Sequence, residues 1–395
     1  MTVDEAAGRR WDVLVVGAGP AGAMAAREAA RRSASVLLID RAAFPRRKAC
    51  GGCLNAVALD ALRAAGLGAL PARLGAQPLA DLRLAIERQH AVFRLPPMMA
   101  LSREVFDTAL IEHAVLAGAR FLPEADVCAT EASAAGRDVI VHHRGRRLTL
   151  SANAVVAADG LGGRWLDAHR ALGASVSRRS RIGVGVILEE APPAYAAGRL
   201  FMACARGGYV GLVRLSGGQL AVAAALDPAF VSAQRGATAS VRALLRATGL
   251  PGLDGLADAP WRGTPPFTRR RAGVAAERMF LIGDAAGYVE PFTGEGIAWA
   301  LASGLAVAPL AVAATHRWAP TFEAQWTEIY QRLIGPRQQT CRLITRALRW
   351  TRLTQAAVRI LSHVPTVAAP FVRRVNEPFR QIVHAGGNAL RMVVE

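Results

Sequence analysis

Residues 11–40, WDVLVVGAGPAGAMAAREAARRSASVLLID, decide the fold of this chain. They begin with an apolar run that ends at Gly17 and predicts a strand buried on both faces. A GxGxxG pattern over 17–22 then leads into an alanine-rich helix, and a second apolar run closes at Asp40. This order of strand, glycine turn, helix, strand and acid predicts a dinucleotide-binding βαβ unit, with Asp40 placed to accept hydrogen bonds from a ribose.

Each glycine of the pattern has its own physical task. Gly17 permits the tight turn, Gly19 lets a pyrophosphate approach the backbone without meeting a Cβ, and Gly22 lets helix and strand pack closely. The helix begins at Pro20, which has no backbone N–H, and it offers the free N–H groups of the residues that follow, Ala21 first, to the phosphates. The pattern alone predicts a dinucleotide site but does not choose between NAD and FAD.

Length and composition suit a large α/β protein with two closely packed domains and a C-terminal tail. The 395 residues can bury a sizeable core, and 52% of them are hydrophobic. The polar N-terminal segment is unlike a secretory signal, and we expect no stretch long and apolar enough to span a membrane. Five scattered cysteines do not form a disulfide framework, which favours a reducing, cytoplasmic setting.

The net charge of +18 is concentrated near the C-terminus. From residue 331 onward, eleven arginines face two glutamates, which places +9 of the total in the last sixth of the chain. No zinc-ligand spacing or nucleic-acid-binding motif accompanies these charges, and aromatic residues make up only 6%, so we expect no nucleic-acid partner. An anionic membrane surface or an acidic substrate fits this charge better.

Part of the basic region has helical periodicity. Arginines recur at i, i+4 and i+7, while apolar residues lean to another side: Arg342, Arg346 and Arg349 against Leu343, Ala347, Trp350 and Ala357. Such a basic amphipathic helix is suited to lie on an anionic bilayer, which would make the protein peripherally membrane-associated. The alternative is a helix packed on the dinucleotide domain with its arginines in water.

The loop after Asp40 contains the only lysine of the chain, Lys48, next to the segment Cys50-Gly51-Gly52-Cys53. The other basic residues among the 48 are all arginine, and lysine differs from arginine in its compact charge and readily shifted pKa. The alternative, that the single lysine stands on a solvated loop by chance, explains Lys48 equally well.

The two cysteines have the spacing of a redox pair or of half a metal site. No second CxxC or CxxH follows, so we expect no metal.

The remaining patterns predict a Rossmann-like parallel sheet and a second, mixed or antiparallel sheet. Expected strands of the first sheet are 120–122, 154–158 and 279–282, next to a hairpin of 138–143 and 146–150. We expect one helix over 229–248 and a solvated turn at 269–271. The predicted division is 1–75, 98–175 and 265–315 for the dinucleotide domain, 76–97 and 176–264 for a substrate-binding sheet domain, and 316–395 for a helical, basic C-terminal region.

Three stretches resemble the FAD motifs of glutathione-reductase-type flavoproteins with the hydroxylase-like fold. They are GAGPAG at 17–22, ADG at 158–160 and GDAAGYVEPFTGEGI at 283–297. The last of these, together with FPRRKACGGCLN at 44–55, resembles the geranylgeranyl reductase branch, a neighbour of flavin halogenases and aromatic hydroxylases. The resemblance spans about residues 10–310 and implies an FAD-dependent oxidoreductase.

The resemblance also implies roles for individual residues. Asp159 would lie near the pyrophosphate, Arg103 would reach FAD from its helix, and Asp284 would bind the ribityl chain. Val127 would meet the adenine through its backbone, and the amides of 294–297 would point at the flavin pyrimidine. The full set of implied FAD contacts is Gly17, Gly19, Pro20, Ala21, Gly22, Asp40, Arg41, Cys50, Gly51, Gly52, Arg103, Val127, Asp159, Gly160, Gly283, Asp284, Gly294, Glu295, Gly296 and Ile297.

Departures from the known branches leave the reaction open. Gly287 stands where many aromatic hydroxylases have histidine, the W-x-W-x-I-P stretch of halogenases is absent, and the Tyr-x-Trp-x-Phe-Pro stretch of archaeal reductases is replaced around Tyr209. We expect reduction or dehydrogenation of a C=C bond, with Cys50 or Lys48 as the proton donor. The hydrophobic substrate, isoprenoid or polyketide-derived, would contact Phe201, Met202, Tyr209 and Arg214.

Two other functions remain consistent with the sequence. One is an NAD(P)H-driven FAD monooxygenase that hydroxylates an aromatic or lipid-like substrate. The other is a flavin-binding protein without turnover that its basic tail recruits to a membrane or partner. Because no second dinucleotide fingerprint is present, NAD(P)H would bind without a domain of its own.

Overall fold

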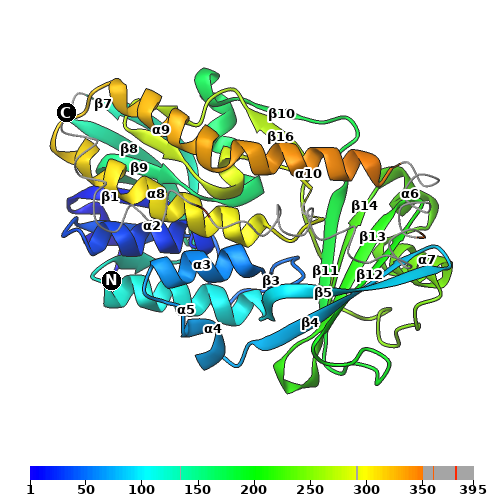
Figure 1. The fold of residues 1–395 in the computed structure, drawn as a ribbon. Coiled ribbons are helices and arrows are strands. Elements are labelled where there is room, and N and C mark those ends of the chain that lie inside the picture. Colours follow the sequence, from blue (N-terminus) through cyan, green and yellow to red (C-terminus); the bar gives the residue numbers. More distant parts are fainter. Residues whose placement is uncertain (134, 291, 350–358, 360–378, 380–395) are drawn as a thin grey trace.

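Two large sheets form the two ends of the molecule in this computed structural model (Figure 1). A parallel sheet with its helices occupies one end, and a mostly antiparallel sheet occupies the other. The predicted α/β class with a second sheet domain is confirmed. The structure describes residues 1–133, 135–290, 292–349, 359 and 379.

The βαβ unit predicted from residues 11–40 is present. It consists of β1 (Arg10–Val16), α2 (Pro20–Ala30) and β2 (Val36–Ile39). β1 lies at the centre of the sheet, with β2 parallel on one side and β9 (Arg146–Ala157) parallel on the other. Nearly every residue of the β1 run is buried, because helices or loops cover both faces of the sheet.

The first sheet has the strand order β17-β18-β9-β1-β2-β6. Its outer members are β17 (Ala275–Ala276), β18 (Met279–Leu281) and β6 (Arg120–Leu122). β7 (Ala125–Ser133), which the patterns did not predict, and β8 (Gly136–His143) extend it as an antiparallel ribbon. The expected separate strands 146–150 and 154–158 are one strand, β9. Its first half pairs with β8 and its second half with β1, so the polar residues between them interrupt the pattern but not the strand.

The second sheet has the order β15-β11-β14-β13-β12-β4-β5-β3, and only the pair β12–β4 is parallel. Its strands are β15 (Arg262–Gly263), β11 (Ile182–Leu188), β14 (Leu220–Leu226), β13 (Gly208–Arg214), β12 (Arg199–Ala205), β4 (Gln77–Ile86), β5 (Gln89–Ala100) and β3 (Cys53–Leu54). A small third sheet joins β10 (Ala174–Val176), β16 (Arg269–Arg271) and β19 (Gly287–Tyr288).

The expected single helix over 229–248 is two helices, α6 (Pro228–Ala233) and α7 (Ala237–Thr248). Arg235 and Gly236 both have positive φ between them, which ends the first helix. The other helices are α1 (Val3–Ala7), α3 (Ala56–Ala64), α4 (Leu70–Arg73), α5 (Arg103–Leu116), α8 (Gly296–His316), α9 (Thr321–Leu333) and α10 (Gly335–Ala347).

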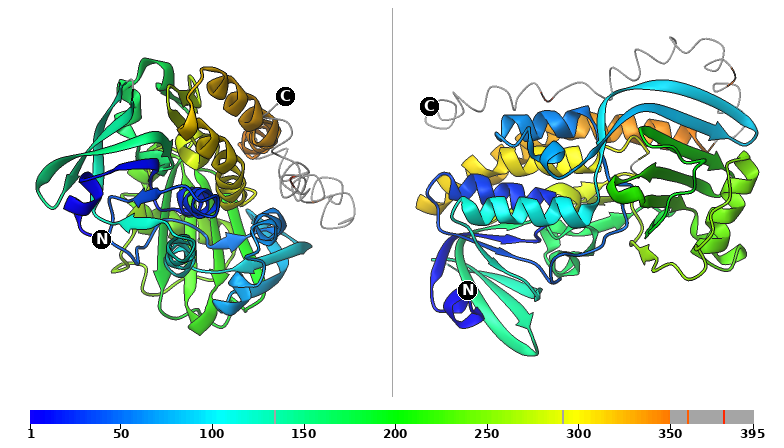
Figure 2. Two further views of the ribbon diagram at one scale, coloured as in Figure 1. Left: turned by 90° about the vertical axis from the view of Figure 1, so that its left-hand side faces the viewer. Right: turned by 90° about the horizontal axis from the view of Figure 1, so that it is seen from below.

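α8 contradicts the expectation that no stretch is long and apolar enough to cross a membrane. Among the described residues, α8 meets both conditions: it has 21 residues, and its most apolar window of 18 residues has a mean hydropathy of 1.9. In the structure it packs in the core beside α2, and α5 flanks α2 on the other side, as Figure 2 shows. Gly304 makes this contact possible, because a Cβ there would lie 2.5 Å from the Ala21 carbonyl oxygen. Burial in the core therefore accounts for the composition of α8.

α10 contains the described part of the predicted amphipathic helix. Its buried face consists of Gln338, Cys341 and Thr345, whereas Leu343, expected on the apolar side, is exposed. The helix runs from the parallel sheet toward α6, where Arg349 pairs with Asp227 at 3.2 Å (Figure 1). Trp350 and Ala357, which complete the predicted apolar side, lie outside the described residues.

Candidate functional site

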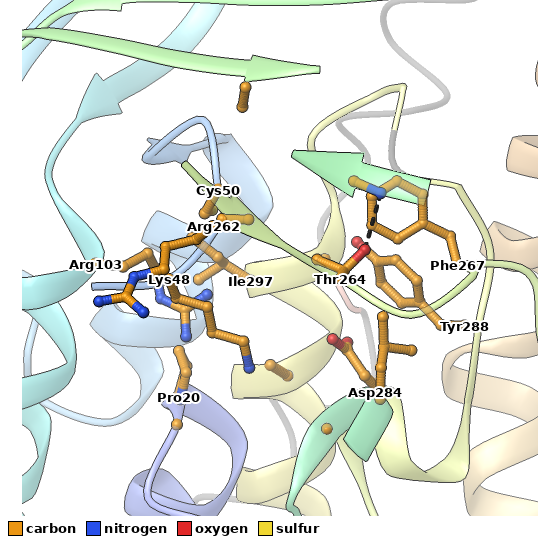
Figure 3. Close-up of a pocket in the computed structure, with 18 of the residues that line it drawn as sticks. Pro20, Lys48, Cys50, Arg103, Arg262, Thr264, Phe267, Asp284, Tyr288 and Ile297 are labelled. Carbon is orange, nitrogen blue, oxygen red and sulfur yellow. Dashed lines mark hydrogen bonds between the residues drawn. The ribbon is translucent and has the colours of Figure 1, made fainter. Parts of the chain in front are cut away.

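A cavity of about 1510 Å³ lies between the parallel sheet and the second sheet. It extends from the β1–α2 turn past the 41–53 loop to one face of the second sheet (Figure 3). The predicted site residues that line it are Gly17, Gly19, Pro20, Ala21, Asp40, Arg41, Lys48, Cys50, Gly51, Arg103, Val127, Asp159, Gly160, Met202, Tyr209, Asp284, Gly294, Gly296 and Ile297. Residues far apart in the sequence, from Gly17 to Ile297, thus converge on one space.

Four of the implied cofactor contacts do not line this cavity. Gly22, Gly52 and Gly283 instead allow close packing behind its wall; a Cβ on Gly52, for example, would lie 2.7 Å from the Leu101 carbonyl oxygen. Glu295 turns toward α10, where its carboxylate pairs with Arg337 at 3.1 Å and accepts a hydrogen bond from Thr293 at 2.8 Å. The structure places these residues as supports of the site and not as its surface.

Two of the four predicted substrate contacts also lie elsewhere. Phe201 points to the opposite face of the second sheet, where it packs edge-to-face on Tyr195 with ring centroids 5.0 Å apart. Arg214 lies near the turn at Gly218, outside the cavity lining. Met202 and Tyr209 do line the cavity, because side chains alternate between the two faces of a strand.

The glycine turn has the geometry that a pyrophosphate requires. Gly17 has φ +100°, and a Cβ there would lie 2.5 Å from the Ala158 carbonyl oxygen. A Cβ on Gly19 would instead project into the cavity, 3.6 Å from the Arg46 guanidinium and 3.7 Å from that of Arg103. The bare Gly19 backbone at the N-terminus of α2 therefore lies beside two guanidinium groups in the cavity wall, an arrangement that fits a dinucleotide phosphate.

Arg46 is a residue of this site that the sequence did not single out. Its guanidinium lies 3.6 Å from both the Asp40 and the Asp107 carboxylates. Asp107 also holds Arg103 through two hydrogen bonds of 2.7 and 2.8 Å. Asp40 accepts a hydrogen bond from the Ala18 amide at 2.8 Å, so it fixes the glycine turn in addition to facing the cavity.

Two further acids, Asp159 and Asp284, line the cavity. Asp159 accepts a hydrogen bond from the Trp165 indole at 2.7 Å, and burial raises the pKa of its carboxyl to about 6. Burial also raises the pKa of Asp284, although the positive charges of Lys48 and Arg103 oppose this shift. Both positions follow strands of the parallel sheet at their carboxyl ends, where α/β sheets bind their ligands.

The Cys50–Cys53 loop lies at the junction between the cofactor end and the second sheet. Both thiols are free and both residues line the cavity. Burial raises the pKa of Cys53 to about 12, which keeps that thiol protonated. The loop packs closely on β11, because a Cβ on Gly185 would lie 2.9 Å from the Ala49 Cα. Among the described residues no cluster of His, Cys, Asp or Glu is arranged to hold a metal ion.

The expectation of a solvated turn at 269–271 is wrong, since these residues form β16. The Arg271 side chain is buried and donates hydrogen bonds to the carbonyl oxygens of Ala285, Leu172 and Gly163, at 3.1, 2.9 and 3.3 Å. It also pairs with Asp167. Arg271 thus ties the segment after Asp159 to the segment after Asp284, a role that only the tertiary structure reveals.

Arg271→Leu is expected to destabilise the protein by about 3 kcal/mol, because three buried carbonyl oxygens lose their donor. Thermal unfolding of the FAD-loaded variant measures the loss. Arg270→Leu, which removes the exposed neighbouring arginine, is the control and should unfold close to wild type. Equal unfolding temperatures for the two variants would contradict the bracing role of Arg271.

The opposite end of the cavity is apolar. Its walls come from β4, β5, β12 and β13 of the second sheet, and they include Leu82, Leu95, Met98, Leu200, Met202 and Val213. At the border with the cofactor end, Tyr209 packs edge-to-face on Phe292 with ring centroids 5.1 Å apart. Behind it, Arg181 and Glu290 form a buried ion pair of 2.8 Å. The cavity therefore joins a charged region at the glycine turn to an apolar region at the second sheet.

The glycine turn, the acid that ends β2 and the adjoining cavity define a dinucleotide-binding α/β protein. The chain matches the FAD binding domain family over residues 10–310 and belongs to that family. FAD is therefore the dinucleotide, and the protein is an FAD-dependent oxidoreductase.

Curated relatives confirm the resemblance to the geranylgeranyl reductase branch. A menaquinone reductase of Mycolicibacterium smegmatis is 30% identical over 331 residues, which are 76% of each chain. Digeranylgeranylglycerophospholipid reductase 2 of Methanosphaera stadtmanae is 34% identical over 159 residues, 38% of this chain and 39% of that protein. The second alignment thus spans well under half the length of that relative.

Solved structures share the fold at low sequence identity. A geranylgeranyl bacteriochlorophyll reductase-like protein of Thermoplasma acidophilum has a TM-score of 0.72 at 19% identity, over 95% of this chain and 98% of that one. The flavin-dependent brominase Bmp2 has a TM-score of 0.75 at 16% identity, over 98% and 99%. These likenesses establish the architecture, which reductases and halogenases have in common.

Proposed function

We propose that this FAD-dependent oxidoreductase reduces a carbon–carbon double bond in a long, hydrophobic, isoprenoid-type substrate. The observation that carries the proposal is the continuity of the cavity from the glycine turn to the apolar face of the second sheet. A flexible hydrocarbon chain can lie in the apolar end and present one bond at the cofactor end. The names of the relatives, menaquinone reductase and digeranylgeranylglycerophospholipid reductase, support a reductase of lipid molecules.

Different residues of the chain would serve different steps of this reduction. When bound, reduced FAD supplies the hydride. Side chains such as Leu82, Met98 and Met202 bury the substrate and exclude water from it. Cys50, at the junction of the two ends, is positioned to deliver the proton that completes the reduction. NAD(P)H is the proposed electron donor, and bleaching of the flavin absorbance when it is added without oxygen tests this part.

The test is anaerobic incubation of dithionite-reduced, FAD-loaded protein with isoprenoid quinones and isoprenoid glycerophospholipids in liposomes. Mass spectrometry is expected to show a gain of two hydrogen atoms in one of these lipids. A gain of one oxygen atom in air with NAD(P)H, and no gain of hydrogen without air, would instead establish a monooxygenase.

Met202→Glu is expected to abolish this reduction while FAD stays bound, because it places a charge in the apolar end of the cavity. Arg214→Glu adds a carboxylate to the same sheet outside the cavity and is the matched control. Product formation and flavin content are measured for both variants. Full activity of Met202→Glu would contradict the proposal that the substrate binds against the second sheet.

A further inference from the structure

Lys48 places a positive charge in the cavity. Its ammonium forms no ion pair with any residue that the structure describes, whereas Arg46 and Arg103 both have carboxylate partners. The Lys48 side chain is exposed, because it lines the open cavity. Burial and the charges of Arg103 and Arg46 lower the pKa of Lys48, and the charges of Asp284 and Asp107 oppose this shift. An anion in this space would relieve that repulsion.

The position of the Lys48 ammonium indicates which anion would bind beside it. A Cβ built on Gly160 would lie 3.3 Å from the Lys48 Nζ. Figure 3 shows the side chain extended past Pro20 toward the side of the cavity that holds Asp284, away from Cys50. Gly19, which faces Arg46 and Arg103, borders the same space from the other wall. Three cations therefore surround the gap between the glycine turn and the 158–160 motif.

We propose that Lys48 binds the diphosphate of FAD, together with Arg46 and Arg103, and is not the proton donor to the substrate. A compact ammonium with three donors can reach a phosphate oxygen from the loop side of the cavity. The Cys50 thiol, two residues further along, remains at the junction with the apolar end. The sequence offered either residue as the proton donor, and in the structure the Lys48 side chain extends away from Cys50.

The loop geometry gives this contact a second consequence. Ala49 lies between Lys48 and Cys50 and packs on Gly185 of β11, with the Cys50 amide nitrogen 3.2 Å from the position of a Gly185 Cβ. A diphosphate held by Lys48 anchors the loop from one side while β11 supports it from the other. Cofactor binding therefore seats Cys50 against the substrate sheet.

Lys48→Met tests the proposal in the full-length chain freed of flavin. Its Kd for FAD, followed by flavin fluorescence, is expected to rise about 10- to 100-fold, the loss typical of one hydrogen bond to a charged group. Its Kd for ADP, measured by calorimetry, should rise similarly, whereas that for riboflavin, which has no phosphate, should stay unchanged. Arg144→Met is the control, because the exposed Arg144 pairs with Glu124 at 2.6 Å and lies outside the cavity lining.

Lys48→Arg keeps a positive charge and should bind ADP more tightly than Lys48→Met. Wild-type affinity of Lys48→Met for FAD and ADP would overturn the proposal. So would an equal loss of riboflavin affinity, since it would mean a general collapse of the cavity. The test needs no substrate, so its outcome is independent of the proposed reaction.

Discussion

Replacing Gly22 by alanine is expected to abolish FAD binding. A Cβ at this position would lie 1.8 Å from the Gly17 carbonyl oxygen and 3.1 Å from the Ala158 Cβ. The Gly17 backbone forms the turn that would bind the pyrophosphate, so moving it away from the new Cβ would distort the FAD site. We expect FAD affinity to fall at least about 100-fold, together with a loss of about 3 kcal/mol of stability.

Flavin content after purification and an FAD titration measure the effect of Gly22→Ala. Gly252→Ala is the control, since a Cβ there would meet no heavy atom within 4 Å. It should retain both FAD and wild-type stability. A Gly22→Ala protein that purifies with full flavin would show that the turn adapts, and the contact between α2 and β1 would then be less constrained than the structure indicates.

The cofactor half of this protein was predictable because its ligand dictates local sequence. A pyrophosphate at a helix N-terminus requires glycines at fixed spacing, and the next strand must end in an acid that is about twenty residues away. Gly17, Gly19 and Asp40 could therefore be placed from a single stretch. Asp284 was placed by the resemblance of the stretch 283–297 to an FAD motif, and in the structure it lies three residues after the buried strand β18.

The substrate half was less predictable because both faces of the second sheet are apolar. Phe201 and Met202 are neighbours on β12 and point to opposite sides, one toward α7 and one toward the cavity. An alternating pattern reveals a buried sheet only when one face is polar. The sequence therefore could not decide which of the two residues faces the substrate.

Contacts between distant residues were also beyond the sequence. Arg271 reaches carbonyl oxygens that lie about a hundred positions earlier in the chain, at Leu172 and Gly163. Within RRR at 269–271 nothing local distinguishes a buried arginine from a solvated one. Arg46 and Arg47 pose the same problem, since only the fold shows that Arg46 is the one that faces Asp107.

Arg103→Met is expected to destabilise the protein strongly and to weaken FAD binding. Asp107 is completely buried, and the variant leaves it with Arg46, 3.6 Å away, as its remaining cationic partner. Breaking a buried ion pair from one side costs about 3–5 kcal/mol. Burial alone would lower the pKa of Arg103, but the charge and hydrogen bonds of Asp107 raise it overall, so the guanidinium stays charged. Chemical denaturation and FAD titration measure the two losses.

The double variant Arg103→Met/Asp107→Leu separates the two roles of Arg103. It removes both charges of the buried pair, so we expect most of the lost stability to return. FAD affinity should stay about 10- to 100-fold below wild type, because the guanidinium that faces Gly19 is still missing. Recovery of FAD affinity along with stability would mean that Arg103 serves only to neutralise Asp107. In that case Arg46 and Lys48 would be left as the cations that hold the diphosphate, and the losses in their variants would have to be correspondingly larger.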